Sequence, residues 1–444
     1  MDYKLERPRP RQNFCPTPTF KGSDTPTQIC ILGGGFGGLY TALYLQRFPW
    51  FKSQNCQITL VDRKDHLVFT PLLYELVTHE LQPWEIAPSF KKLTYNTTIQ
   101  FCQGIVRGVD LETRQVKVEK KPSAGREGFE LDPLVLVYDY LVLAVGAEMR
   151  LDGIPGATTY AHPFRTITDA ERLEEQLRLL ETSNRPEIRV AVVGGGPSGV
   201  ELACKLADRL RGRGQVRLIE RGQEILKTFS PYSRAAAYRA LKARRVQIDF
   251  ETSVESIESD RITLFREGQM LDLPVDLVLW TVGTRSIDWV RNLPCRHNSQ
   301  GQLITLPTLQ LIDYPEVFAL GDLAEIQDPR GRQIPATAQV AYQQADCAAL
   351  NINRAIAGKR LRNFHYLHMG EMLTLGKGEA VVSSFALKLE GRLAGIIRQF
   401  VYLQRLPTVR HRLQVLRHWV WQWLTGLWQQ VVRLIFDRRR RRKL

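Results

Sequence analysis

The sequence predicts an α/β fold with two Rossmann-like dinucleotide-binding domains, followed by a C-terminal region of different character. Three observations lead to this prediction. Two glycine-rich fingerprints, residues 33–38 and 194–199, begin 161 residues apart. Each follows an apolar run of the kind that forms a buried parallel strand. A second apolar run then ends in an acidic residue, Asp62 after the first fingerprint and Glu220 after the second.

The first unit begins with a predicted strand over residues 28–32. Gly33 allows a tight turn, Gly35 lets backbone amides approach a pyrophosphate, and Gly38, with Gly37 before it, lets the following helix pack closely on the sheet. Asp62 lies 24 residues beyond Gly38. A carboxylate near this offset accepts a hydrogen bond from a ribose hydroxyl.

The second unit repeats the pattern after a predicted strand over residues 190–193. Gly194, Gly196 and Gly199 take the same three roles, and Glu220 lies 21 residues beyond Gly199. In both units the pyrophosphate is expected at a helix N-terminus, where the dipole favours an anion. A glycine-rich turn in an ordinary α/β protein is the alternative for one motif, but two complete units favour two bound dinucleotides.

Two later segments, residues 138–147 and 317–322, indicate which dinucleotide each unit binds. They resemble the segments that bracket an inserted nicotinamide domain in the two-dinucleotide flavoprotein superfamily. The resemblance implies FAD in the first unit, NADH or NADPH in the second, and flavin contacts from Gly146, Gly321 and Asp322. Val145 replaces the usual threonine of this pattern, so we expect no polar contact from it.

The same resemblance suggests a division of the chain into domains. We expect a flexible arm at 1–27, a discontinuous FAD-binding domain at 28–155 and 295–360, an NAD(P)H-binding domain at 156–294, and a C-terminal region at 361–444. A length of 444 residues with 44% hydrophobic residues suffices for two or three domains with their own cores. The proline-rich arm lacks the apolar stretch of a signal peptide.

The seven cysteines are scattered and form no CxxC or CxxxxC pair. Their ordinary interpretation is reduced, mostly buried thiols, and we expect no metal site. Disulfide reductases of this superfamily carry a cysteine pair on the helix after the first fingerprint, and residues 39–48 contain none. This absence argues against a disulfide reductase. A disulfide or sulfide oxidoreductase stays as an alternative, but it would need Cys102 or Cys347 to lie near the flavin by chance. A membrane redox sensor without enzymatic activity is another.

Residues 335–344, at the start of a helix predicted to run to about Ala357, resemble the AQxAxQQ segment of type II NADH dehydrogenases. Residues 69–75 and 280–283 are similar to the same family. The resemblance implies non-proton-pumping NAD(P)H:quinone oxidoreductase activity, with Gln339 and Gln343 edging a quinone pocket beside the flavin and Glu201 as the acid near the nicotinamide. Surface glutamines and a first-turn acid favoured by the helix dipole are the alternatives.

Within this family the sequence is most similar to the cyanobacterial and plastid branch that includes reductases of demethylphylloquinone, which serve vitamin K1 synthesis. The quinone is then a prenylated naphthoquinone, with a plastoquinone-type benzoquinone also open. Glu220 favours NADH, because a carboxylate repels the 2'-phosphate of NADPH. Arg217 and Arg221 beside it relax that preference, so both nucleotides remain open.

The C-terminus indicates a membrane surface. Residues 407–436 have apolar side chains at helical spacing, and four of the eight tryptophans fall here. No run of eighteen uncharged apolar residues exists, which favours a helix lying in the interface plane. The members of the apolar stripe are Val409, Leu413, Leu416, Val420, Trp423, Leu427, Val431 and Leu434.

Residues 405–444 hold eleven Lys and Arg against the single Asp437, and so contribute +10 of the net charge of +15. A basic cluster beside an amphipathic helix attracts anionic lipid. We therefore expect a peripheral membrane protein on the cytoplasmic face of a thylakoid or plasma membrane, without nucleic-acid binding. A dimerisation helix with a solvated tail, and hence a homodimer, is the alternative. Residues 119–131 suggest a hairpin tip, and 361–405 a small strand-rich region.

Overall fold

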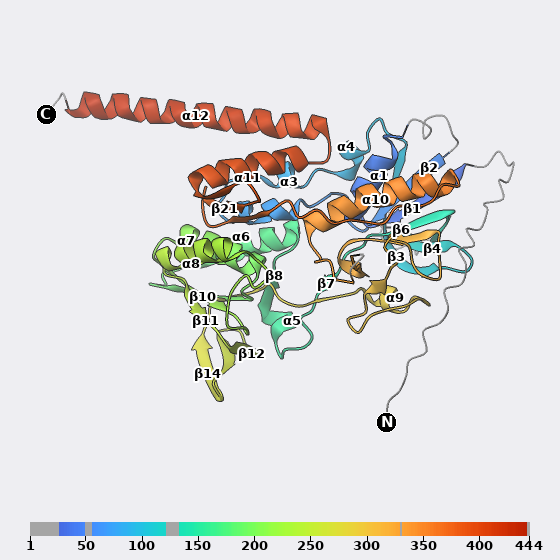
Figure 1. Cartoon of the computed structure of the whole chain (residues 1–444). Coiled ribbons are helices and arrows are strands. Elements are labelled where there is room, and N and C mark those ends of the chain that lie inside the picture. The colour runs from blue at the N-terminus through green and yellow to red at the C-terminus, as the bar shows by residue number, and fades with distance from the viewer. Residues whose placement is uncertain (1–25, 49–55, 121–132, 329–330, 442–444) are drawn as a thin grey trace.

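The computed structural model describes residues 26–48, 56–120, 133–328 and 331–441, and for 426–441 it describes the backbone alone. Within these ranges the chain has the predicted α/β fold, with two parallel sheets side by side and two long C-terminal helices above them (Figure 1). The arm at 1–25 and most of the hairpin tip lie outside the described residues, as do the side chains of Trp428 and of the basic tail.

The first sheet has seven strands in the order β18-β6-β1-β2-β3-β4-β5. It is parallel from β18 to β3, and β4 and β5 add an antiparallel extension. Its strands are β1 (Thr27–Leu32), β2 (Cys56–Asp62), β3 (Ile99–Asp110), β4 (Gln115–Lys120), β5 (Leu134–Val137), β6 (Tyr140–Leu143) and β18 (Val317–Ala319). Helices α1 (Phe36–Leu45) and α10 (Ala338–Ile356) pack against each other beside it (Figure 1).

The second sheet has five parallel strands in the order β11-β10-β9-β15-β8. They are β8 (Ala161–Pro163), β9 (Ile188–Val193), β10 (Gly214–Ile219), β11 (Gln247–Asp249) and β15 (Leu277–Trp280). Helices α6 (Ile167–Thr182), α7 (Pro197–Leu210) and α8 (Pro231–Ala243) accompany it. A separate antiparallel sheet projects from its lower end: β12 (Thr252–Ile257), β13 (Arg261–Arg266) and β14 (Gln269–Pro274) (Figure 1).

Short elements connect these sheets. They are η1 (Thr70–Leu76), α3 (Pro83–Ile86), α4 (Phe90–Leu93), β7 (Glu148–Met149), α5 (Ala157–Tyr160), β16 (Thr284–Arg285), α9 (Asp288–Arg291), β17 (Leu303–Ile304), η2 (Gly321–Leu323) and β19 (Ala324–Glu325). Of these, η2 matters most for the site, because it follows β18 and so brings a late segment of the chain to the edge of the first sheet.

The C-terminal region begins with a three-stranded antiparallel sheet of β20 (Glu371–Thr374), β21 (Ala380–Ser383) and β22 (Lys388–Gly391). The prediction of strands is confirmed here, but it is wrong for the apolar stretch at 393–397, which lies in helix α11 (Arg392–Arg405). Glycine is needed at position 395 of this helix, because a Cβ there would lie 2.4 Å from the Gly378 carbonyl oxygen. The glycine allows α11 to pack tightly on the preceding loop.

Helix α12 (Val409–Arg441) has two different faces. One docks on the body: Val415 is buried, His411 Nε2 lies 2.8 Å from the Glu85 carbonyl oxygen, and Trp419 donates to the Glu85 carboxylate at 2.6 Å. The predicted apolar stripe lies elsewhere, and its described members are exposed: Val409, Leu413, Leu416, Val420 and Trp423. No helix among the described residues is long and apolar enough to cross a bilayer.

Candidate active site

Three glycines lie at one edge of the first sheet. Gly33 follows β1, and Gly146 and Gly321 follow the adjacent parallel strands β6 and β18. All three have positive φ, at 97°, 72° and 73°, a backbone conformation that L side chains rarely adopt. The sheet thus places three tight turns together at its carboxyl edge, where α/β proteins bind ligands.

The loop after β1 has the shape that a pyrophosphate requires. A Cβ on Gly35 would meet no atom within 4 Å, so its backbone faces open space. A Cβ on Gly38 would lie 1.8 Å from the Gly33 carbonyl oxygen, which makes glycine necessary where α1 packs on the loop. The Asp62 carboxylate accepts from the Gly34 amide at 2.6 Å and from the Lys64 amide at 2.8 Å, which leaves it further acceptor capacity.

The loop after β9 repeats this geometry. Gly194 has a φ of 112°, and a Cβ on Gly196 would again meet no atom within 4 Å. A Cβ on Gly199 would lie 1.8 Å from the Gly194 carbonyl oxygen. Glu220 accepts from the amides of Gly195 and Gly222, both at 2.6 Å. Both loops therefore fit dinucleotides, because each has open backbone at a helix N-terminus and a nearby carboxylate.

Asp322, from the first unit, forms an ion pair with Arg165, from the second, at 3.2 Å. The Arg165 Nη1 atom is buried and has no hydrogen-bond partner among the described residues. A buried cationic nitrogen without a partner beside the η2 turn fits a polar or anionic group of a bound cofactor. The contact therefore joins the two units next to the glycine loop after β1. We call this loop the first cradle and the glycine loop after β9 the second cradle.

The segment 69–75 bridges the two glycine loops. The Phe69 ring lies 5.2 Å from that of Phe36, the first residue of α1, in an edge-to-face arrangement. Five residues later, Tyr74 donates its hydroxyl to Ser198 Oγ at 2.8 Å, in the first turn of α7. One short segment therefore contacts both helix N-termini that are expected to bind phosphates.

A buried ion-pair cluster lies behind this segment. Arg398 of α11 donates to the carboxylate of Glu75, to that of Glu201 at 3.4 Å, and to the Pro71 carbonyl oxygen at 2.6 Å. Arg398 and Glu75 are each 2% exposed and Glu201 is 6% exposed. One guanidinium therefore faces two carboxylates away from water, and at most one carboxylate is fully neutralised by it.

The pKa of Glu201 reflects this setting. Burial raises it to about 7, although Arg398 and the Thr374 amide, which donates to Glu201 at 2.9 Å, both lower it. Burial likewise raises the pKa of Tyr402, whose ring lies 4.9 Å from the Arg398 guanidinium carbon. A carboxyl group whose pKa is close to neutral can hold or release a proton under ordinary conditions. The cluster thus combines a titratable acid with a buried cation.

Gln339 and Gln343 lie on the side of α10 that meets residues 366–370. Gln343 pairs with the Leu367 backbone in both directions at 2.9 Å, and Gln339 accepts from the Tyr366 hydroxyl at 2.6 Å. The structure does not bring either glutamine into hydrogen-bond contact with the cluster around Arg398. Their observed bonds fasten the 366–370 segment to α10.

Sequence reasoning missed three residues that the structure brings to the site. Gln344 is buried and accepts from the Gly321 amide at 2.8 Å, so it supports the turn after β18. Its spacing from Ala341, Ala345 and Ala348 places it on the buried stripe of α10, a signal that was available. Arg398 and Glu75 gave only the weaker signal of single charges within apolar runs.

The surroundings of the cysteines do not favour reactive thiolates. Burial raises the pKa of Cys204 and of Cys347 to about 12, and it also raises the pKa of Cys102. Thiolates are therefore suppressed at these positions, and the thiolate is the reactive form. The described cysteines are all free thiols.

The pyridine nucleotide-disulphide oxidoreductase family matches residues 27–345. The chain is 45% identical over 399 residues to "Demethylphylloquinone reductase NdbB" of Synechocystis, covering 90% of this chain and 96% of that protein. It is 40% identical to "Alternative NAD(P)H-ubiquinone oxidoreductase C1, chloroplastic/mitochondrial" of Arabidopsis thaliana, covering 88% of this chain and 80% of that one.

Solved structures agree on the fold. NDH2 of Plasmodium falciparum, solved with NADH, superposes with a TM-score of 0.77 at 19% identity, over 89% of this chain and 97% of that one. The sulfide:quinone oxidoreductase of Aquifex aeolicus follows with a TM-score of 0.70 at 18% identity, over 84% and 89%. The prediction of a two-dinucleotide flavoprotein fold is confirmed. The chain belongs to the pyridine nucleotide-disulphide oxidoreductase family and, within it, to the type II NADH:quinone oxidoreductases.

Proposed function

We propose that this protein is an FAD-dependent NAD(P)H:quinone oxidoreductase that reduces a prenylated quinone, with demethylphylloquinone as the first candidate and a plastoquinone-type benzoquinone as the second. One observation carries the proposal: helix α11 has a buried residue, Arg398, in contact with both carboxylates behind the glycine loops, and an exposed apolar face at Leu393, Ile396 and Phe400. The same helix therefore joins the junction of the two cradles to an apolar surface. The names of the relatives point to the same activity.

In this proposal the first cradle holds FAD through Gly33, Gly35, Gly38 and Asp62, and Arg165 faces its polar groups. FAD, when bound, supplies the two-electron chemistry that couples nicotinamide oxidation to quinone reduction. The protein aligns the two ring systems and excludes water. Residues of segment 69–75 separate the two helix N-termini at a fixed spacing, because they contact both.

The second cradle holds the nicotinamide dinucleotide through Gly194, Gly196, Gly199 and Glu220. The Glu220 carboxylate favours NADH over NADPH. Arg217 is engaged with Asp249 at 2.8 Å, so of the two neighbouring arginines only the exposed Arg221 is left to offset the charge of Glu220. We therefore propose NADH as the better substrate.

Glu201 is proposed to hold the proton that the reduced quinone requires, because its pKa lies near 7 and Arg398 connects it to α11. Gln339 and Gln343 remain proposed as residues that shape the quinone pocket. Their hydrogen bonds hold residues 366–370 in place, and that segment includes the exposed apolar side chain of Leu367. The two glutamines would therefore shape the quinone pocket through this segment.

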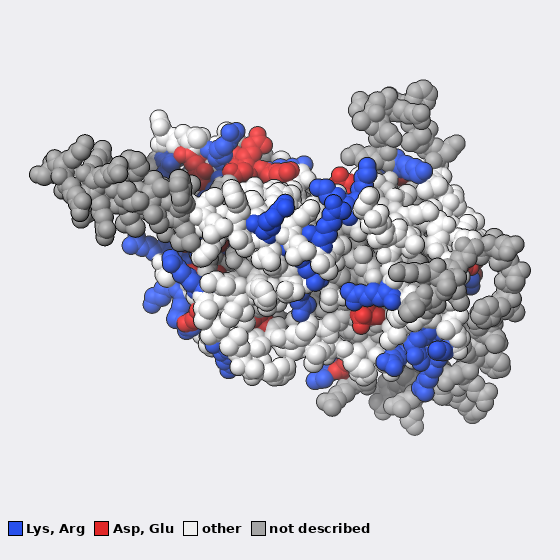
Figure 2. Space-filling model, turned by 90° about the horizontal axis from the view of Figure 1, so that it is seen from above, with Lys and Arg blue, Asp and Glu red and all other residues white. Residues whose placement is uncertain are grey.

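We further propose that the face formed by α11 and α12 lies on a membrane, as a peripheral attachment on the cytoplasmic side of a thylakoid or plasma membrane. Figure 2 shows this face from above: most of it is uncharged, Lys and Arg side chains are scattered across and around it, and a group of Asp and Glu lies at one border. Exposed tryptophans at 421 and 423 suit the headgroup boundary. A homodimer that covers the same face is the competing arrangement.

The domain division is also part of this proposal. The FAD-binding domain comprises residues 28–155 and 295–360, and the NAD(P)H-binding domain comprises residues 156–294.

Anaerobic stopped-flow absorbance tests the proposed activity. The FAD-loaded protein is mixed first with NADH or NADPH and then with a short-chain naphthoquinone or benzoquinone. Bleaching of the flavin absorbance followed by rapid quinone-dependent recovery supports the proposal and ranks nucleotides and quinones. Bleaching without recovery by any quinone contradicts it and favours a thiol acceptor or a redox sensor; a triple variant C102S/C204S/C347S distinguishes these two.

A further inference from the structure

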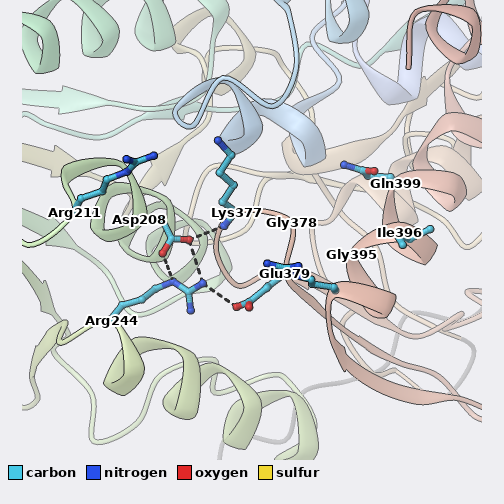
Figure 3. Close-up of a pocket in the computed structure, with 10 residues that line it drawn as sticks. Asp208, Arg211, Arg244, Lys377, Gly378, Glu379, Gly395, Ile396 and Gln399 are labelled. Carbon is cyan, nitrogen blue, oxygen red and sulfur yellow. Dashed lines mark hydrogen bonds and ion pairs between the residues drawn. The ribbon is translucent and has the colours of Figure 1, made fainter. Parts of the chain in front are cut away.

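A cavity of about 660 Å³ lies away from the glycine loops, between the C-terminal end of α7, the loop before β21 and the first turns of α11. Figure 3 shows Asp208, Arg244 and Glu379 meeting at its floor, with Arg211, Lys377, Ile396 and Gln399 spaced around them. The cations that line it are Arg211, Arg244, Lys377 and Arg392, and its carboxylates are Asp208 and Glu379. The cavity therefore carries a positive charge.

Arg244 pairs with both carboxylates. It donates to Asp208 through two nitrogens, at 2.7 and 3.1 Å, and to Glu379 at 2.8 Å. Asp208 also accepts from the Lys377 amide at 2.6 Å. A Cβ on Gly376 would lie 2.1 Å from Arg244 Nη2, so this glycine allows the ion pairs to form directly beneath the loop. The floor of the cavity is thus a built ion-pair network with one cation and two carboxylates, and the three other cations leave the lining with an excess of two positive charges.

The other three cations have no acidic partner. The side chains of Arg211, Lys377 and Arg392 are exposed and form no ion pair with any carboxylate in the described part of the chain. Three like charges around one cavity repel one another, and a bound anion relieves that repulsion. The arrangement matches a phosphate group, which accepts hydrogen bonds from several Lys and Arg side chains at once.

The rim of the cavity identifies the source of the phosphate. Ile396 lines the cavity and also belongs to the exposed apolar face of α11, together with Leu393 and Phe400. A ligand that fills the cavity therefore continues onto an apolar surface. Free phosphate has no apolar part that could contact that surface, whereas an amphiphile places its charged head in the cavity and its chains along α11.

We propose that this cavity binds the phosphate headgroup of an anionic phospholipid. The inference rests on the proposed membrane attachment of the α11–α12 face and adds a defined headgroup site to it. Because α11 carries Arg392 in the cavity and Arg398 in the buried cluster, a bound headgroup also fixes the helix that covers the junction of the two cradles.

Vesicle flotation of the full-length FAD-loaded protein tests the site. Partition is measured on phosphatidylcholine vesicles and on vesicles of equal parts phosphatidylcholine and phosphatidylglycerol, and the readout is the ratio of the two partition coefficients. The basic tail is the same in every variant. R211Q/K377Q/R392Q should lower this ratio about 100-fold, since each cation near an anionic surface contributes about 1 kcal/mol and 1.4 kcal/mol corresponds to tenfold.

A control variant, K117Q/K120Q/K359Q, removes three exposed lysines far from the cavity and should change the ratio far less. Gln399→Trp narrows the cavity without changing its charge, and it should lower the ratio at least tenfold. Equal losses in both triple variants, or an unchanged ratio in Q399W, would show diffuse attraction in place of a site and overturn the proposal.

Two further readings separate the remaining outcomes. Partition onto neutral vesicles should be similar in all variants. If the wild type does not bind these vesicles at all, membrane attachment itself is refuted. Inorganic phosphate added at matched ionic strength should leave the wild-type ratio unchanged. If it abolishes the preference, the cavity binds the free anion and the headgroup assignment is wrong. Unchanged flavin absorbance in every variant verifies that the protein remains folded.

Discussion

Replacing Arg398 tests the buried cluster most directly. In Arg398→Met the side chain keeps much of its volume but loses the charge that faces Glu75 and Glu201. Because all three residues are buried, the variant leaves carboxylates without a cation in a poorly solvated position. Removing one partner of a buried ion pair costs about 3–5 kcal/mol of unfolding free energy.

The pH dependence of this loss has a definite sign. The pKa of Glu201 in the folded protein, about 7, lies above its ordinary value of 4.5. Its contribution to stability is therefore fully present below pH 4.5 and is lost as the pH rises through about 7. Arg398 lowers this pKa, so R398M raises it further. Each additional unit adds about 1.4 kcal/mol to the loss above the new pKa, and the deficit of R398M should grow from acidic to alkaline pH.

The assay is urea unfolding of the FAD-loaded protein, followed by tryptophan fluorescence and flavin release, at pH values on either side of 7. Arg239→Met is the matched control, because the Arg239–Glu390 pair has side chains 58% and 47% exposed and should cost at most about 1 kcal/mol. A second variant, E75Q/R398M, should recover part of the loss, since one unpaired carboxylate is removed. If R398M is no less stable than R239M at both pH values, the buried cluster does not have the energetics described.

Three further predictions concern the cradles and the acid. Quinone turnover should fall as the pH rises through about 7. Glu201→Gln should lower turnover by about 10²–10⁴-fold and abolish that pH dependence. An unchanged steady-state pH profile in E201Q contradicts the proton role of Glu201. Gly199→Ala should lower thermal stability without any dinucleotide, because its Cβ meets a carbonyl at 1.8 Å. Gly196→Ala should retain stability yet weaken NADH binding at least about tenfold, and equal melting temperatures for these two variants, by calorimetry, would refute this reasoning. Glu220→Ser should raise the NADPH to NADH ratio of kcat/KM about tenfold or more, whereas a ratio unchanged in steady-state kinetics would remove Glu220 from nucleotide selection.

The membrane-facing region illustrates the limit of reading periodicity alone. The apolar stripe of α12 was visible in the sequence, yet its orientation was not. In the structure Val415, His411 and Trp419 face the body, while Val420 and Trp423 are exposed. The spacing identifies a face, but which face is covered depends on Glu85, more than 300 residues earlier in the chain.

The sequence by itself determined the two nucleotide units, because their requirements are local. A glycine after Leu32 or Val193 is required by φ and by the approach of a helix to its own loop, and these constraints act over a few residues. The family followed from the same motifs and from residues 335–344, and the comparisons confirmed it.

Only the tertiary structure decided which distant side chains meet. Glu75, Glu201 and Arg398 come from three elements separated by more than 100 residues at each step, and no local rule links them. The stretch at 393–397 lies in helix α11, and the loop at Gly378 approaches this helix closely only because residue 395 is glycine. Local sterics are encoded in consecutive residues, whereas burial and the pairing of charges depend on how the whole chain closes around them.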